Sequence, residues 1–162
     1  MQKLHTINYQ NFSPNELCNY LDERYYAQIL HDFDSTEKYL SDLAHNEESQ
    51  SIDLVITLFY KLQNEVKQLF VKDRILLFPH VVAEKNNSIS LTPINIIHQR
   101  ILTILQKIRE LMNNYIQQPN WSSAYKICSN ELYGLEQLIH YVLYVKENFL
   151  WTRINTIVNH EV

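Results

Sequence analysis

The sequence predicts an all-α fold, an up-down-up-down four-helix bundle that forms a single domain over residues 1–162. The chain has one glycine and four prolines, which is too few for the many turns of a β fold. Its apolar residues recur every three or four positions in four long runs, and this spacing places them on one face of a helix. Four such helices with short connections indicate a bundle, and a composition of 46% hydrophobic and 20% charged residues suits a globular domain.

The first helix is expected to run from about Pro14 to the HNEES stretch at residues 45–49. The Ser13 side chain can cap its first turn, Pro14 fits there because no hydrogen-bond donor is needed, and Glu16 can reach back to the cap. The repeat of apolar positions predicts an inward face. That face consists of Leu17, Cys18, Leu21, Tyr25 or Tyr26, Ile29 or Leu30, Phe33, Leu40 and Leu43.

The second helix is expected to start near Ser51 or Asp53 and to end or kink at Pro79, before a polar loop over residues 84–90. Its apolar stripe is interrupted by one acid, so the pattern predicts a carboxylate at a core-facing position. The stripe consists of Val55, Phe59, Leu62, Val66, Leu69, Asp73 and Leu76.

The third helix is predicted to follow a cap at Thr92, with Pro93 in its first turn. Its spacing predicts that His98 borders or enters the core, because this residue flanks the apolar seam. The seam consists of Ile94, Ile97, Ile101, Ile104, Ile108, Leu111 and Tyr115, with Leu105 and Met112 beside His98 on the flank.

The fourth helix is expected from roughly Trp121 to Val158, and its inward face carries a lysine. An ammonium group among aliphatic side chains costs several kcal/mol unless it finds a partner or loses its proton. The helix therefore requires an acid opposite Lys146. Counting by three and four from this lysine gives the rest of the face: Cys128, Leu132, Leu135, Ile139, Val142, Phe149 or Leu150, and Arg153.

Three segments together resemble the hemerythrin-like domain of the iron-sulfur cluster repair family. They are ELCNYLDERYYAQI, LFYKLQNEVKQLFVKDRILLFPHV and the long stretch from IHQRILTILQKIREL through MNNYIQQ and ELYGLEQLIHYVLYVKENFLWTRI. The family consists of di-iron proteins implicated in responses to nitric oxide and oxidative stress. The resemblance covers nearly the whole chain and implies a four-helix bundle with an iron site in its core.

The family's metal ligands can be carried over onto this chain position by position. The resemblance implies six positions: Tyr26 (or Tyr25), Leu69, His98 and Val142 for the histidines, and Asp73 and Lys146 for the bridging glutamates. A di-iron centre needs several imidazoles and two bridging carboxylates from four helices, and Lys146 instead places a positive charge where iron would bind. We therefore expect no metal and no cofactor, with bound iron as the alternative.

The sharper hypothesis is that the Lys146 ammonium substitutes for the cation and pairs with Asp73. Tyr26 and His98 would then add hydrogen bonds to the pair. In an alternative arrangement Lys146 extends to the end of the bundle and Asp73 is a surface acid. A single-metal site built from His98, Asp73 and Tyr26 is a third arrangement.

Charge and composition argue against several classes of function. The net charge of −4, without any run of Lys and Arg, argues against nucleic acid as a partner. No stretch approaches the roughly 18 consecutive apolar residues of a membrane span. Cys18 and Cys128 lack CxxC spacing and suggest reduced thiols of a cytoplasmic protein. No metal-binding spacing connects five of the remaining histidines, His5, His31, His45, His80 and His160.

The sequence thus predicts a degenerate hemerythrin-like protein that works as a non-catalytic binding or regulatory module. The alternative is a di-iron or mono-metal protein of the iron-centre repair and nitric-oxide stress response class. A bundle that holds a ligand in a small apolar pocket is a third reading. The partner would be another protein or a small ligand, with a homodimer as one form. Nucleophilic catalysis has little support. Cys128 and Ser129 are predicted to lie within a helix, and the sequence lacks the glycine-rich G-x-S-x-G turn that exposes a nucleophile in many hydrolases.

Overall fold

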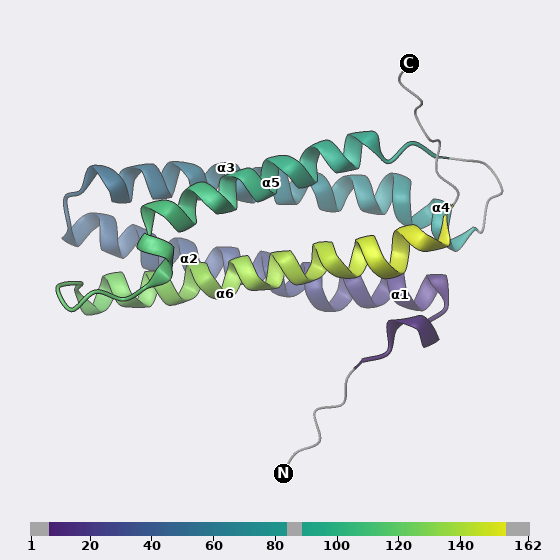
Figure 1. The fold of residues 1–162 in the computed structure, drawn as a ribbon, viewed down its shortest axis with the longest axis horizontal. Coiled ribbons are helices and arrows are strands. Elements are labelled where there is room, and N and C mark those ends of the chain that lie inside the picture. The colour runs from purple at the N-terminus through teal and green to yellow at the C-terminus, as the bar shows by residue number, and fades with distance from the viewer. Residues whose placement is uncertain (1–6, 84–88, 155–162) are drawn as a thin grey trace, which may run out of the picture.

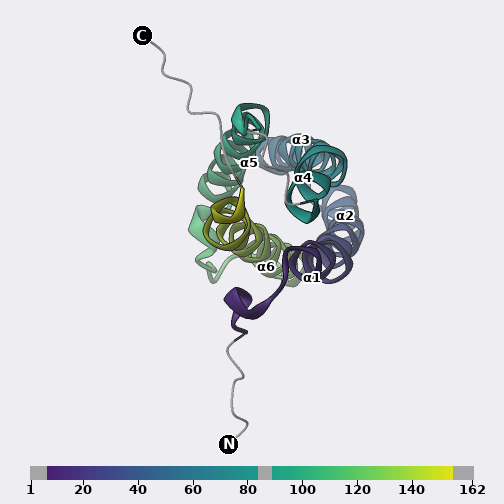
Figure 2. The same cartoon turned by 90° about the vertical axis from the view of Figure 1, so that its right-hand side faces the viewer.

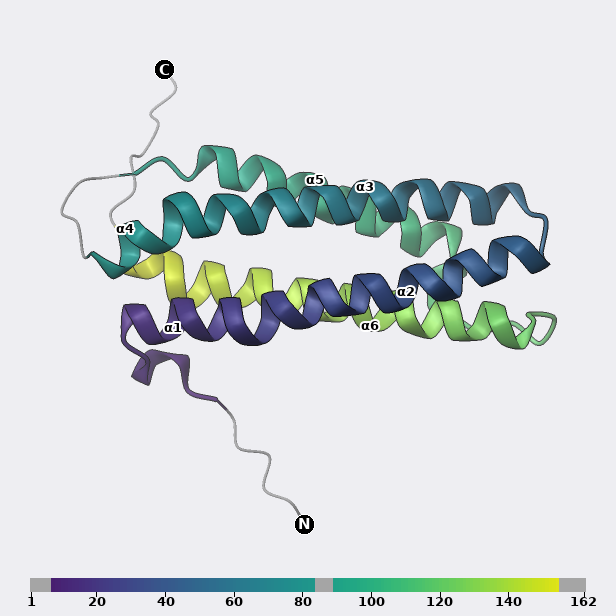
Figure 3. The ribbon, with the colours of Figure 1, turned by 180° about the vertical axis from the view of Figure 1, so that it is seen from behind.

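The computed structural model describes residues 7–83 and 89–154, and these residues form helices without any β-strand. The predicted all-α class is therefore confirmed. Four long helical segments lie side by side (Figure 1). Seen from one end, the four segments surround a common centre (Figure 2). The view from behind shows α3 running along α5 and α2 running along α6, which are the closest helix pairs (Figure 3).

Three of the four segments change their winding near one end. The first comprises α1 (Pro14–Tyr20), a wide π-helical turn (Leu21–Tyr26) and α2 (Ala27–Asn46). The second comprises α3 (Gln50–Lys72), a π turn (Asp73–Leu77) and α4 (Phe78–Val82). The third is α5 (Thr92–Leu111), without interruption. The fourth comprises α6 (Ser123–Val145), a π turn (Lys146–Leu150) and a 3-10 turn (Trp151–Arg153). Short 3-10 turns also occur at Tyr9–Asn11 and Asn113–Tyr115.

The helix ends follow from local chemistry, with small corrections to the prediction. The Ser13 hydroxyl accepts a hydrogen bond from the Glu16 backbone N–H, and the Glu16 carboxylate accepts one from the Ser13 N–H, so the predicted capping box is present. The hydroxyl of Ser122 accepts from the Tyr125 N–H, and α6 therefore begins two residues later than expected. Thr92 is the first residue of α5 rather than its cap.

Pro79 changes the winding of its helix instead of ending it at once. Proline lacks the N–H that would bond to the carbonyl four residues earlier, and its ring crowds that carbonyl. The π turn Asp73–Leu77 immediately precedes α4, whose first turn contains Pro79, and α4 continues to Val82. Most of the predicted polar loop falls on residues 84–88, which lie outside the described residues.

The fourth helix ends earlier than predicted. Ile154 has an extended backbone (φ −123°, ψ 150°), so helical winding ends at Arg153 rather than at Val158. The remainder of that prediction falls on residues 155–162, outside the described residues.

The apolar faces predicted from spacing form the core. Where the sequence left two options, the structure buries Tyr26, Ile29 and Leu150. Leu111, Tyr115 and Arg153, which were predicted to face inward, are only half-buried. One predicted core residue is exposed: Leu76 is 49% exposed, whereas its neighbour Leu77 is fully buried. A π turn holds more residues than an α turn, so the inward position after Asp73 shifts by one. No helix in the described parts of the chain is long and apolar enough to cross a membrane.

Candidate functional site

The three π turns each carry one residue of a buried polar cluster. Tyr26 closes the first π turn, Asp73 opens the second and Lys146 opens the third. These turns belong to three different helical segments, and His98 joins the cluster from α5. Because π turns inside α-helices occur frequently at functional sites, their presence here marks the cluster as the candidate site.

The cluster is a chain of short hydrogen bonds centred on one carboxylate oxygen. Lys146 Nζ lies 2.6 Å from Asp73 Oδ2, and the Tyr26 hydroxyl donates to the same oxygen over 2.6 Å. On its other side, Lys146 Nζ lies 3.0 Å from His98 Nε2. The side chains of Lys146 and Asp73 are both 0% exposed. The alternative arrangement, with Lys146 at the end of the bundle and Asp73 at the surface, requires both side chains to reach the solvent. Neither does, so that arrangement is wrong.

Aromatic rings wall the cluster on two sides. The Tyr26 ring stacks on Phe70, with ring centroids 3.8 Å apart and planes 6° apart, and Phe78 stacks at 5.9 Å. The His98 ring stacks on Trp151, with centroids 5.1 Å apart. These rings keep water away from the polar atoms, and low polarity strengthens each hydrogen bond while penalising any unpaired charge.

Burial and mutual attraction act in opposite directions on the ion pair. Burial raises the pKa of Asp73, and the adjacent Lys146 ammonium offsets part of this rise. Burial likewise lowers the pKa of Lys146, and Asp73 offsets part of that fall. Burial and the Asp73 charge raise the pKa of Tyr26, so its hydroxyl stays protonated and remains a donor. With two donors aimed at one oxygen, the cluster favours Asp73 as a carboxylate.

His98 is a neutral member of the cluster. Burial and then the Lys146 charge lower its pKa from 6.5 to about 3. Because Nε2 accepts a hydrogen bond from the Lys146 ammonium, the single proton of the neutral ring belongs on Nδ1. Glu147 Oε1 lies 3.7 Å from Nδ1, and this glutamate side chain is 50% exposed. His98 therefore stands between the buried pair and an acid at the surface.

The donor set does not fit a di-iron centre. Leu69 and Val142 are buried aliphatic side chains and cannot bind metal. One imidazole, one carboxylate and one phenol remain, and the Lys146 ammonium contacts the first two directly. Among the described residues, no group of three or more His, Cys, Asp and Glu side chains is arranged to hold a metal ion.

A second buried acid, Glu136, was not predicted from the sequence. The Glu136 side chain on α6 is 2% exposed, and its Oε1 accepts two hydrogen bonds from Arg109, at 2.8 and 3.0 Å. His140 Nε2 lies 3.4 Å from the same oxygen. The signal was present in the sequence, because Glu136 follows Leu132 by four positions and therefore shares its inward face.

Three tyrosine hydroxyls form a hydrogen-bonded cluster next in sequence to the site residue Tyr26, through its neighbour Tyr25. The Tyr9 hydroxyl lies 3.0 Å from the Tyr25 hydroxyl and 2.5 Å from the Tyr141 hydroxyl. Tyr9 precedes the predicted helices, so its place in the core could not be read from periodicity.

The remaining candidate residues do not join the cluster as ligands. Cys18 and Cys128 are buried free thiols, and burial raises their pKa to about 12 and about 11. His31 and His45 are exposed and His80 is half-buried, whereas His5 and His160 lie outside the described residues.

No family model matches the chain, and no curated protein matches it either. The resemblance to the hemerythrin-like domain therefore stays a prediction from the sequence.

Proposed function

We propose that this protein is a metal-independent, degenerate hemerythrin-like domain with an up-down-up-down bundle fold. In this proposal the Lys146 ammonium occupies the place of the cation, and the domain serves as a non-catalytic binding or regulatory module. The observation that carries the proposal is the contact of Lys146 Nζ with both Asp73 Oδ2 and His98 Nε2 inside a fully buried cluster.

The buried Lys146 ammonium opposes the binding of a second cation in this cluster. A metal ion placed among these donors would lie within a few ångströms of a buried ammonium, where repulsion is poorly screened. The ammonium instead supplies one positive charge and hydrogen-bond donors directed at Asp73 and His98, with no need for a bound ion. The fold would then be stable without metal, unlike domains whose folding depends on metal binding.

A binding role is supported by three exposed aliphatic side chains within four residues of Asp73 in sequence. Val71, Ile75 and Leu76 are 50%, 66% and 49% exposed, and they lie on either side of Asp73 in sequence. Exposed apolar side chains that gather in one region mark contact surfaces more often than isolated ones do.

The test is elemental analysis of the full chain purified from iron-supplemented cells. The proposal expects far less than one iron, zinc or manganese per chain, and a melting temperature that a chelator does not change. About two irons per chain would overturn it in favour of the di-iron alternative. One tightly held metal per chain, lost together with stability on chelation, would favour the mono-metal alternative.

A further inference from the structure

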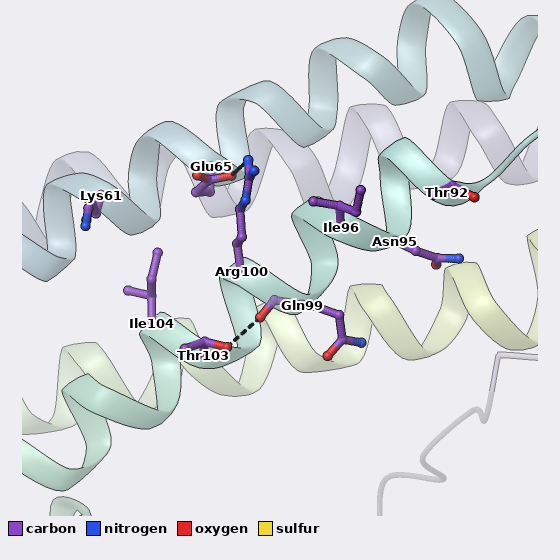
Figure 4. Close-up of a pocket in the computed structure, with 9 residues that line it drawn as sticks. All are labelled: Lys61, Glu65, Thr92, Asn95, Ile96, Gln99, Arg100, Thr103 and Ile104. Atoms are coloured by element: carbon purple, nitrogen blue, oxygen red, sulfur yellow. Dashed lines mark hydrogen bonds and ion pairs between the residues drawn. The ribbon is translucent and has the colours of Figure 1, made fainter.

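A groove runs along the outer side of the α3/α5 pair and belongs to no part of the buried cluster. Its volume is about 660 Å³, within the range of small-molecule sites. Two positions of α3, Lys61 and Glu65, face a stripe of α5 across it (Figure 4). The stripe of α5 consists of Thr92, Asn95, Ile96, Gln99, Arg100, Thr103 and Ile104.

The groove carries an unbalanced positive charge. Its charged lining residues are Lys61, Arg100 and Glu65, so two cations meet one acid. Arg100 NH1 lies 3.9 Å from Glu65 Oε2, which is too long for a hydrogen bond. Within the described parts of the chain, the guanidinium makes no hydrogen bond, and its side chain is 58% exposed. A planar guanidinium with free donors suits bidentate binding of a carboxylate.

The rest of the groove surface is mainly apolar. Ile96 is 47% exposed and lies between Arg100 and the Thr92 end of the stripe, whereas Ile104, at the opposite end, is 8% exposed. The Thr103 hydroxyl donates a hydrogen bond to the Gln99 backbone carbonyl over 2.9 Å within α5, so its proton does not need an acceptor on the ligand. The aliphatic stems of Lys61 and Arg100 extend the apolar surface.

We propose that this groove binds an amphiphilic monocarboxylate, such as a medium-chain fatty acid. The carboxylate pairs with the Arg100 guanidinium, and Lys61 supplies a second positive charge. From Arg100 the apolar chain extends along Ile96 toward the start of α5, and Ile104 lies on the opposite side of Arg100, near Lys61. A monoanion matches the net charge of the lining, whereas a phosphate or a polar sugar would leave the apolar walls without a partner.

The experiment titrates the full chain with octanoate and follows backbone amide shifts by two-dimensional NMR. Octan-1-ol and octyltrimethylammonium have the same chain with a neutral and a cationic head group. Octanoate is expected to bind saturably, with a Kd of about 1 mM for a ligand of about ten non-hydrogen atoms. The shifts are expected at Ile96, Arg100 and Ile104, and both other probes should bind at least about tenfold more weakly.

Two variants assign the head-group contact. Arg100→Gln removes the charge from an exposed side chain and should weaken octanoate binding by about tenfold without changing the circular dichroism spectrum. Lys38→Gln removes an exposed lysine on α2, away from the groove, and should leave binding unchanged. Equal binding of all three probes, shifts that map elsewhere, or no saturable shift up to 10 mM would each overturn the proposal.

Discussion

Lys146 Nζ lies 2.6 Å from Asp73 Oδ2 although the two residues are 73 positions apart in the chain. Both side chains are fully buried, and the Tyr26 hydroxyl donates to the same oxygen. Two charges removed from water are costly individually, and each becomes acceptable only because the other is present. This mutual dependence makes the pair open to direct thermodynamic tests.

Removing one member of the pair should cost far more than removing both. Lys146→Met or Asp73→Leu leaves an uncompensated buried charge, and each single substitution should lower the free energy of unfolding by about 3–5 kcal/mol. The double variant should lose less than either single variant, because no lone charge remains. Urea denaturation of wild type, the two single variants and the double variant gives the four free energies of unfolding for a double-mutant cycle.

The matched control for this cycle is Lys38→Met, which changes an exposed lysine and should alter stability by less than about 0.5 kcal/mol. Additive losses in the double variant would mean that Lys146 and Asp73 do not depend on one another.

Stability should fall on acidification because His98 resists protonation in the folded chain. The native pKa of His98 is lowered from 6.5 to about 3 by burial and by Lys146. A depressed native pKa gives a stabilising contribution that is complete above pH 6.5 and is lost as the pH falls toward 3. The slope for this one group is at most about 1.4 kcal/mol per pH unit.

His98→Gln isolates this contribution, because glutamine keeps an acceptor for Lys146 but does not titrate. Wild type should lose stability relative to this variant between pH 6.5 and pH 4 in urea denaturation. Nitrogen-15 NMR should show a neutral His98 ring at pH 5. A ring that titrates near pH 6.5 would contradict the buried position of His98.

Two of the charged core residues, Asp73 and Lys146, were predicted because the sequence spacing alone placed them on apolar faces. Asp73 follows Leu69 by four positions and Lys146 follows Val142 by four, and both are buried as that count requires. The count fails one turn later, where the π turn at Asp73–Leu77 brings in Leu77 instead of Leu76. Counting by three and four assumes α-helical winding throughout, so it gives the wrong inward residue after a π turn.

Side-chain contacts between different helical segments could not be predicted from the spacing of residues within one helix. Trp151 falls within the predicted fourth helix, but its stacking on His98 depends on how that helix meets α5. Likewise, Tyr25 and Tyr26 are equivalent by spacing, and only the packed structure directs Tyr26 toward Asp73.

Lys146→Glu should turn the cluster into a metal site. The substitution replaces the ammonium with a second carboxylate beside Asp73 and His98, and two buried carboxylates repel unless a cation binds. Without metal the variant should be less stable than wild type. Added Co²⁺ should raise its melting temperature and produce a visible absorption band, while wild type should show neither effect.

The control for metal binding is the double variant His98→Ala with Lys146→Glu, which removes the only imidazole of the cluster and should lose most of the Co²⁺ response. A response of equal size in wild type would show that the metal binds elsewhere on the protein.

In the connection after α5, substitution by glycine and by alanine should have different effects on the free energy of unfolding. Asn113, Asn114 and Tyr115 all have left-handed backbones, with φ of 52°, 54° and 60°. This region costs ordinary residues about 1–2 kcal/mol, and asparagine tolerates it best after glycine. Tyr115 is held there by its ring contacts, with the Arg109 guanidinium at 5.3 Å and the Tyr133 ring at 5.7 Å.

Asn114 is the position to test because it is exposed, so its substitution changes backbone preference more than packing. Asn114→Ala should lower the free energy of unfolding by about 1 kcal/mol, whereas Asn114→Gly should leave it equal or higher. Asn64→Ala, at an exposed position within α3, should instead stabilise slightly because alanine favours a helix. Equal free energies of unfolding for the alanine and glycine variants of Asn114, measured by urea denaturation, would contradict a left-handed backbone conformation at this residue.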